Sequence, residues 1–139
     1  EALLLKSLLA VLFVLSLAAL LYTLFIALPT KTYTGPGQEG ELQQGGVYGM
    51  CRHPGFWPFA GCWLFLWLFY KDGVLLAMGA SQIVLNLVYI WWQDRWIFPV
   101  ALPGYESYRT QVPFLIPDAA MISRISLDTS WNVGIQPLD

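Results

Sequence analysis

The sequence has 139 residues, of which 57% are hydrophobic and 12% are charged, and its net charge is −2. Soluble proteins carry about 25% charged residues, and a soluble domain of this length would leave large apolar patches on its surface. The composition therefore excludes an ordinary soluble domain, and the charge offers no basic field that would attract nucleic acid. We predict a single all-α integral membrane domain over 1–139.

The first predicted element is a long apolar helix at the start of the chain. Residues 3–28 form an almost unbroken apolar run that Pro29 ends. A helix needs about 20 residues to cross a bilayer, whereas the apolar part of a signal peptide has about 7–15. We therefore predict a transmembrane helix over 3–28. Because the sequence starts with Glu1 and not Met, we expect natural residues before it.

A loop outside the membrane is expected over 29–54. Its first part is rich in Gly and Pro and shows no apolar period. Cys51, within it, and Cys62, in the next apolar run, lack the spacing of a metal or redox motif. A disulfide and a reactive thiol are the alternatives to our interpretation of both as apolar filling, and we predict no metal site.

Two further apolar runs predict a helical hairpin. They cover 55–70 and 74–98, and Pro99 marks the expected end of the second. The connection is Lys71-Asp72-Gly73, in which Gly73 suits the end of a helix. With the first helix, this gives about three transmembrane helices.

Four polar side chains interrupt the last of these runs. Gln82, Asn86, Tyr89 and Gln93 follow spacings of four, three and four, which places them on one face of a helix. Amides that face lipid are costly. We expect this stripe to face the helix bundle or a wet cavity, either as interhelical hydrogen bonds or as the cavity lining.

The final segment, 99–139, mixes aromatic, charged and apolar residues and predicts an interfacial segment followed by a polar tail. Three crossings place it on the same side of the membrane as the 29–54 loop. That side carries most of the basic residues, which favours the cytoplasm: they are Lys31, Arg52, Arg109 and Arg124, with Arg95 near the edge, against Lys6 and Lys71 on the other side.

One motif crosses the boundary between the loop and the second helix. The pattern G-x-Y-x-x-x-R-H-P runs from Gly46 to Pro54 and includes the single His of the chain. It resembles the signature of the isoprenylcysteine carboxyl methyltransferase and phospholipid methyltransferase superfamily. The second block of that family is an acidic pair at a helix end followed by spaced tyrosines and prolines. It is similar to this set: Gln93-Asp94, Tyr105, Tyr108, Val112-Pro113 and Pro117.

The resemblance covers about residues 45–117 and includes three departures. Phe56 stands where the family usually has Tyr, Pro58 where it has Gly, and Gln93 where it has the first Glu of the acidic pair. One carboxylate of the pair, Asp94, is present.

The resemblance implies a membrane enzyme that binds S-adenosylmethionine from the cytoplasm. Its acceptor would be lipid-like or membrane-delivered: a prenylcysteine carboxylate, a phospholipid amine or a small thiol. His53, Arg52 and Asp94 are the implied catalytic residues, and His53 would be the base for a thiol or amine acceptor. The implied cofactor-binding residues are Gly46, Tyr48, His53, Pro54, Gly55, Phe56, Asp94, Tyr105 and Tyr108. Among these, aromatic faces suit the sulfonium cation, Asp94 its amino group, and Arg52 with His53 its carboxylate.

Other interpretations stay open. The chain could be a non-catalytic small subunit of a larger membrane complex with a decayed site, or a relative of the NADPH-dependent enone and sterol reductases. Arg52 and His53 could reach toward lipid headgroups without binding a cofactor. Tyr105 and Tyr108 could be interfacial anchors, as we expect for Trp91, Trp92 and Trp96.

Overall fold

The computed structural model describes residues 1–27 and 46–117, and this part of the chain is all helical apart from turns. The expected helix end at Pro29, most of the 29–54 loop and the tail beyond 117 lie outside the described residues. Five α-helices are assigned in the described part: α1 (Ala2–Leu21), α2 (Phe56–Tyr70), α3 (Gly73–Trp92), α4 (Phe98–Ala101) and α5 (Tyr105–Gln111).

Two π-helical turns and one 3-10 turn complete these elements. The π-helical turn Tyr22–Ile26 continues α1, and a second one, Gln93–Ile97, joins α3 to α4. The 3-10 turn Gly46–Gly49 precedes α2. A π-turn inserts an extra residue into the helical register, and such turns are frequent at functional sites.

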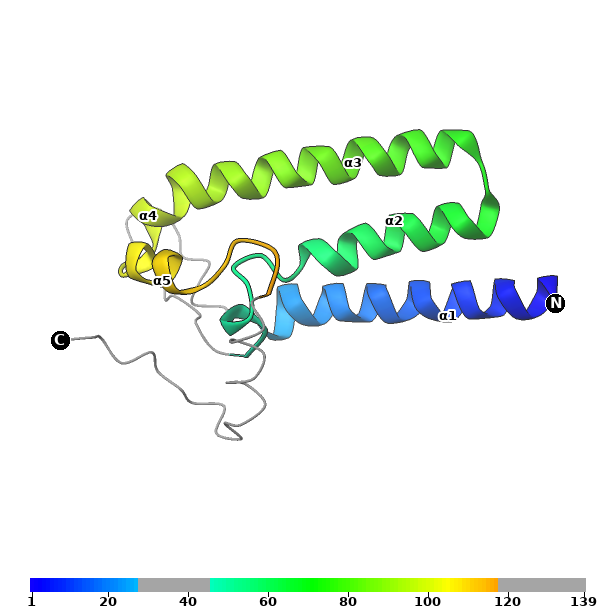
Figure 1. The fold of residues 1–139 in the computed structure, drawn as a ribbon, viewed down its shortest axis with the longest axis horizontal. Coiled ribbons are helices and arrows are strands. Elements are labelled where there is room, and N and C mark those ends of the chain that lie inside the picture. The colour runs from blue at the N-terminus through cyan, green and yellow to red at the C-terminus, as the bar shows by residue number, and fades with distance from the viewer. Residues whose placement is uncertain (28–45, 118–139) are drawn as a thin grey trace.

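The three longer helices lie side by side in one layer, with α2 between α1 and α3 (Figure 1). The short helices α4 and α5 lie at the end of α3 that is remote from the α2–α3 turn, close to the end of α1 (Figure 1). Close approach between the long helices depends on small residues. A Cβ added at Gly79 would lie 3.2 Å from Trp63 Cβ, so α3 packs directly on α2 at this point.

Two helical stretches, Ala2–Ile26 and Gly73–Ala101, are long and apolar enough to cross a membrane by length and composition. Only 11% of the most apolar window of each is buried inside the structure, so neither is the buried core helix of this fold. The apolar helix α2 has 15 residues and is shorter. The prediction of an all-α fold with long apolar helices of membrane-spanning length is confirmed at this level.

The α2–α3 turn uses different residues from those expected. Lys71, not Gly73, takes the left-handed conformation that ends α2, with φ 52° and ψ 36°. Asp72 then begins α3, because its carboxylate accepts hydrogen bonds from the backbone N–H groups of Val74 and Leu75. Gly73 is the first residue of α3.

The third helical stretch also extends beyond its expected end at Pro99. It continues to Ala101, and Pro99 stands in the first turn of α4. Proline is tolerated there, because the N–H groups of a first helical turn have no partner within the helix. The helical hydrogen-bond register changes within the π-turn Gln93–Ile97, so that α4 begins after it with a first turn of its own.

The polar stripe of α3, formed by Gln82, Asn86, Tyr89 and Gln93, faces the bundle in part only. Gln82 and Tyr89 are exposed, and Asn86 and Gln93 are half-buried. The buried residues of α3 are instead Gly79 and Ile90. Asn86 lies seven residues after Gly79 and four before Ile90, so it shares their face, whereas Gln82 and Tyr89 lie at the exposed edge of that face.

The short length of α2 positions the candidate site. A helix of 15 residues is about 22 Å long at 1.5 Å per residue. The first residue of α2 therefore does not reach as far toward the site as the last residues of the longer α1 and α3 stretches. The turn that precedes α2 occupies the remaining space. It contacts α1 through Gly55, where an added Cβ would lie 3.5 Å from Thr23 Cγ2. The same turn reaches α3 through Arg52 and His53, as described next.

Candidate functional site

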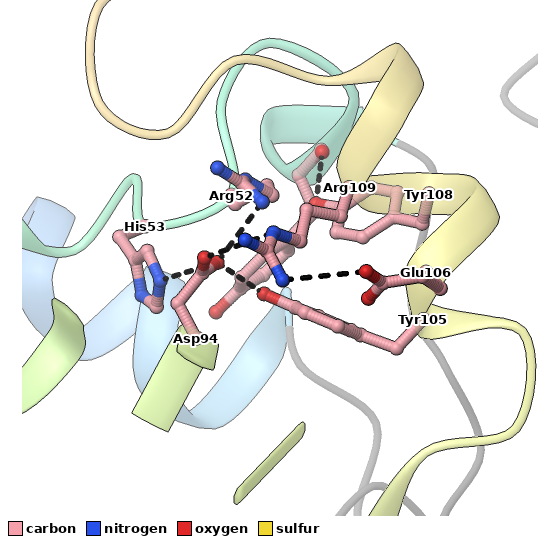
Figure 2. A network of polar contacts seen from close by, with 8 residues as sticks. Arg52, His53, Asp94, Tyr105, Glu106, Tyr108 and Arg109 are labelled. Atoms are coloured by element: carbon pink, nitrogen blue, oxygen red, sulfur yellow. Dashed lines mark hydrogen bonds and ion pairs between the residues drawn. The ribbon is translucent and has the colours of Figure 1, made fainter. Parts of the chain in front are cut away.

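Asp94 is the centre of a buried polar cluster (Figure 2). It lies in the π-turn Gln93–Ile97 and is 5% exposed. Its Oδ1 atom is 3.2 Å from Arg52 Nη1 and 3.4 Å from His53 Nε2, and it accepts a 2.5 Å hydrogen bond from the Tyr105 hydroxyl. A buried carboxylate needs such partners, because desolvation of an unpaired charge is costly.

Backbone hydrogen bonds hold Arg52 and His53 against the C-terminal segment. The N–H group of Arg52 donates to the carbonyl of Pro113 at 2.9 Å. The indole N–H of Trp57, in the first turn of α2, donates to the carbonyl of Leu115 at 2.8 Å. The two sequence blocks of the resemblance are therefore joined directly, on either side of the α2–α3 hairpin.

Two tyrosines, Tyr108 of α5 and Tyr48 of the 46–49 turn, connect the cluster to the rest of the fold. Tyr108 donates its hydroxyl hydrogen bond to the carbonyl of Tyr48 at 2.6 Å. The Tyr48 hydroxyl in turn donates to the carbonyl of Thr23 at 3.1 Å, which lies in the π-turn that ends α1. This chain of hydrogen bonds ties α5, the 46–49 turn and α1 together.

The two α5 tyrosines are almost fully buried, at 2% exposure for Tyr105 and 3% for Tyr108. Burial, followed by the hydrogen bond to Asp94, raises the pKa of Tyr105 far above its ordinary value. Burial is also the main cause that raises the pKa of Tyr108, and it raises the pKa of the Cys51 thiol. All three groups therefore stay protonated at neutral pH.

Arg109 belongs to the cluster, although the motif of the family resemblance does not include it. Its Nε lies 3.8 Å from Asp94 Oδ2, and its Nη1 lies 3.4 Å from Glu106 Oε1 (Figure 2). A signal existed in the sequence, because positions 105, 108 and 109 share one face of a helix. With Arg109 included, two guanidinium groups face two carboxylates.

Aromatic rings enclose the imidazole. The Phe98 ring stacks on His53 at 6.0 Å, and the Phe114 ring meets it edge-on at 5.0 Å. The guanidinium of Arg52 lies over the same Phe114 ring, 5.5 Å from its centre. Phe114 also lines an open apolar hollow of about 450 Å³, together with Leu87, Val88 and Trp91.

Three buried nitrogen atoms of the cluster have no aligned hydrogen-bond partner among the described residues. They are Arg52 Nε, Arg52 Nη1 and His53 Nε2. Arg52 therefore meets Asp94 as an ion pair and His53 lies beside it, in both cases without a well-aligned hydrogen bond. Buried polar groups normally have partners, so these donors would be satisfied by an acceptor such as a carboxylate.

Four of the predicted cofactor-binding residues do not contact Asp94 in the described part of the chain. Gly46, at φ 60°, starts the 3-10 turn. Pro54 and Gly55 form the bend before α2, and Gly55 faces α1. Phe56 is the first residue of α2, and its ring packs edge-on against Trp57 at 5.7 Å. Tyr48 reaches the cluster through its carbonyl, which Tyr108 contacts.

Within 1–27 and 46–117, no group of three or more His, Cys, Asp or Glu side chains gathers as a metal site would require. Comparisons of the chain with models of known protein families, with curated proteins and with solved structures found no match.

Proposed function

We propose that this protein is a membrane-embedded S-adenosylmethionine-dependent methyltransferase that acts on a lipid-like acceptor. The observation that carries the proposal is the convergence of both blocks of the family resemblance on Asp94. Arg52 and His53 come from before the hairpin and Tyr105 from behind it, and each lies within 3.4 Å of Asp94 Oδ1.

The membrane part of the proposal rests on the two long apolar stretches. Their exposed apolar side chains need a nonaqueous environment, since most of each helix is not covered by the protein itself. The helix α2 would be a third, shorter crossing. Its beginning would lie below the membrane surface, and the Arg52–His53 turn would fill the space above it. The basic residues on this side favour the cytoplasm as the compartment that the site faces.

The cluster offers groups that fit the cofactor. The unpartnered donors of Arg52 and His53 suit its carboxylate. The Oδ2 atom of Asp94, whose described neighbour is Arg109 at 3.8 Å, suits its ammonium group. The rings of Phe98 and Phe114 lie against His53, and the ring of Tyr105 lies against Phe98; such aromatic faces attract a sulfonium cation. When bound, the cofactor supplies a methyl group that is already activated for direct displacement.

The residues of the chain would then orient the reactants and exclude water. Asp94 fixes Arg52 and the imidazole, and the neutral phenol of Tyr105 fixes Asp94. If the acceptor is a thiol or an amine, the His53 imidazole would take its proton through Nδ1, because Nε2 faces the Asp94 carboxylate. The apolar hollow suits the hydrocarbon part of the acceptor, because its lining residue Phe114 also contacts the imidazole and the hollow would face lipid.

A second candidate function is favoured by the same cluster. Asp94 already has four partners, so the cluster could act as a latch that holds α5 and the 46–55 turn on α3. The protein would then be a non-catalytic subunit of a larger membrane complex. This role requires no ligand.

Calorimetric titration of the detergent-purified protein with S-adenosylhomocysteine separates the two functions. A methyltransferase gives a binding heat that Arg52→Gln abolishes, because the variant removes the buried donors. The matched control is Arg95→Gln, since Arg95 is adjacent to Asp94 in sequence but exposed, and this variant retains binding. No heat from a folded wild-type protein contradicts the cofactor assignment and supports the latch.

A further inference from the structure

Arg109 lies at the second oxygen of the Asp94 carboxylate (Figure 2). Its Nε is 3.8 Å from Asp94 Oδ2. The other three partners of the carboxylate, Arg52, His53 and the Tyr105 hydroxyl, all contact Oδ1. The proposed function assigns Oδ2 to the ammonium group of the cofactor. A cation of the protein and a cation of the cofactor are therefore assigned to the same oxygen atom.

Arg109 is the partner of Asp94 that is held least firmly. Its side chain is 25% exposed, whereas the side chains of Arg52 and His53 are 10% and 8% exposed. Its distance to the carboxylate, 3.8 Å, is also the longest, compared with 2.5, 3.2 and 3.4 Å for the three contacts at Oδ1. Ion pairs that reach solvent contribute little free energy, so Arg109 can leave the carboxylate more readily than the buried groups can.

Glu106 is placed to hold Arg109 away from Asp94. The Nη1 atom of Arg109 is 3.4 Å from Glu106 Oε1, and the Glu106 side chain is 70% exposed. The two residues are three positions apart on α5, a spacing at which helical side chains meet. A guanidinium has several N–H donors, so Arg109 contacts both carboxylates at once. A rotation of its side chain toward Glu106 would uncover Oδ2 without any movement of α5.

We propose that Arg109 is a displaceable counter-ion of Asp94: its guanidinium neutralises Oδ2 and yields that oxygen to the ammonium group of the cofactor by pairing with Glu106 alone. The charges favour this exchange. If Arg109 stayed in place, the buried carboxylate would face two guanidinium groups and an ammonium group, and like charges in a buried site repel one another strongly. The inference rests on the proposed function, and it makes Arg109 a positioning residue that regulates cofactor binding.

Calorimetric titration with S-adenosylhomocysteine tests the exchange, because neighbouring charges should have opposite effects. Arg109→Gln removes the competing cation and should lower the Kd about two- to fivefold. Glu106→Gln removes the carboxylate that receives Arg109 and should raise the Kd by a similar factor. The matched control for the loss of a positive charge is Arg95→Gln, which should leave the Kd unchanged, since Arg95 is adjacent to Asp94 in sequence but exposed.

A second ligand separates the exchange from a general effect of charge. The analogue of S-adenosylhomocysteine in which hydrogen replaces the amino group keeps the carboxylate and the adenosine, but it has no ammonium group to place at Asp94. Arg109→Gln should therefore not lower the Kd of this analogue. A purely structural role of Arg109 would instead weaken the binding of both ligands.

Misfolding of one variant is controlled by a second variant and a second measurement. Arg109→Met keeps the apolar stem of the side chain, which also packs in arginine, and should lower the Kd for S-adenosylhomocysteine as Arg109→Gln does. Thermal unfolding in detergent shows whether each variant is folded.

The results that overturn the proposal differ from the result that overturns the proposed function. Binding by wild type that folded Arg109→Gln and Arg109→Met weaken or leave unchanged contradicts the exchange alone. Equal tightening for both ligands assigns the effect to net charge and also contradicts the exchange. No binding heat from folded wild type or from either Arg109 variant contradicts the proposed function, and the exchange with it.

Discussion

Asp94 is the residue on which the candidate site depends. A carboxylate that is 5% exposed cannot stay charged without compensation, and Arg52, Arg109 and the Tyr105 hydroxyl provide it. The sequence motif anticipated Asp94, His53 and Tyr105 as site residues. It did not anticipate that they would contact one another directly, because such contacts depend on how α5 folds back over the end of α3.

Removal of the Tyr105 hydroxyl tests whether its hydrogen bond stabilises the buried charge of Asp94. Tyr105→Phe removes a hydrogen bond to a buried carboxylate and should lower the free energy of unfolding by roughly 1.5–3 kcal/mol. Thermal unfolding in detergent measures this effect. Tyr70→Phe is the control, because Tyr70 is 63% exposed, and it should change stability by less than about 0.5 kcal/mol. Equal effects of the two variants would contradict the role assigned to Tyr105.

Alkaline pH should destabilise the protein through the buried tyrosines. The folded protein holds the protons of Tyr105 and Tyr108 more tightly than the unfolded chain, in which tyrosine has an ordinary pKa of 10.0. The two protonated phenols therefore make their full contribution to the free energy of unfolding below pH 10, and this contribution decreases as the pH rises above 10. The thermal midpoint between pH 7 and 11 should fall more steeply for wild type than for the double variant Tyr105→Phe, Tyr108→Phe. Parallel curves would show that these phenols are not buried.

At the scale of the elements, sequence patterns predicted the helices better than their ends. Long apolar runs anticipated the helical stretches of α1, α2 and α3, because hydrophobicity over many residues dominates that choice. The π-turns at Tyr22–Ile26 and Gln93–Ile97 left no signal in composition. They arise where tertiary contacts shift the register, and both contribute atoms to the Asp94 network: the Thr23 carbonyl and the Asp94 carboxylate.

The contact between α2 and α3 depends on Gly79. Gly79→Leu should lower the free energy of unfolding by about 1–3 kcal/mol, because the larger side chain would overlap Trp63. Leucine is a good helix former, so an effect of helix propensity would have the opposite sign. Gly73→Ala is the control, since an added Cβ there meets nothing within 4 Å. Unchanged thermal unfolding of Gly79→Leu in detergent would contradict this packing.

At the scale of the whole molecule, three helices in one layer carry a polar cluster at one end. The layer leaves broad apolar faces, which suits a lipid environment, and the unequal helix lengths leave space for the Arg52–His53 turn. The flat arrangement also explains why the polar stripe is only partly covered, with Asn86 and Gln93 half-buried and Gln82 and Tyr89 exposed. Periodicity placed the four polar residues on one face of α3, but it could not indicate which neighbour that face would meet.

The central claim is that the segments meeting at Asp94 form a methyl-transfer site at the membrane. The most direct measurement starts from membranes that contain the protein. S-adenosylmethionine with a tritiated methyl group is added to these membranes, and the tritium in the lipid extract is counted. Wild type and Arg95→Gln should transfer label above membranes lacking the protein, and Asp94→Asn should reduce transfer at least about 100-fold, as expected when a site-positioning group is lost. Label transfer by wild type no higher than in membranes without the protein, or undiminished transfer by Asp94→Asn, would contradict the claim.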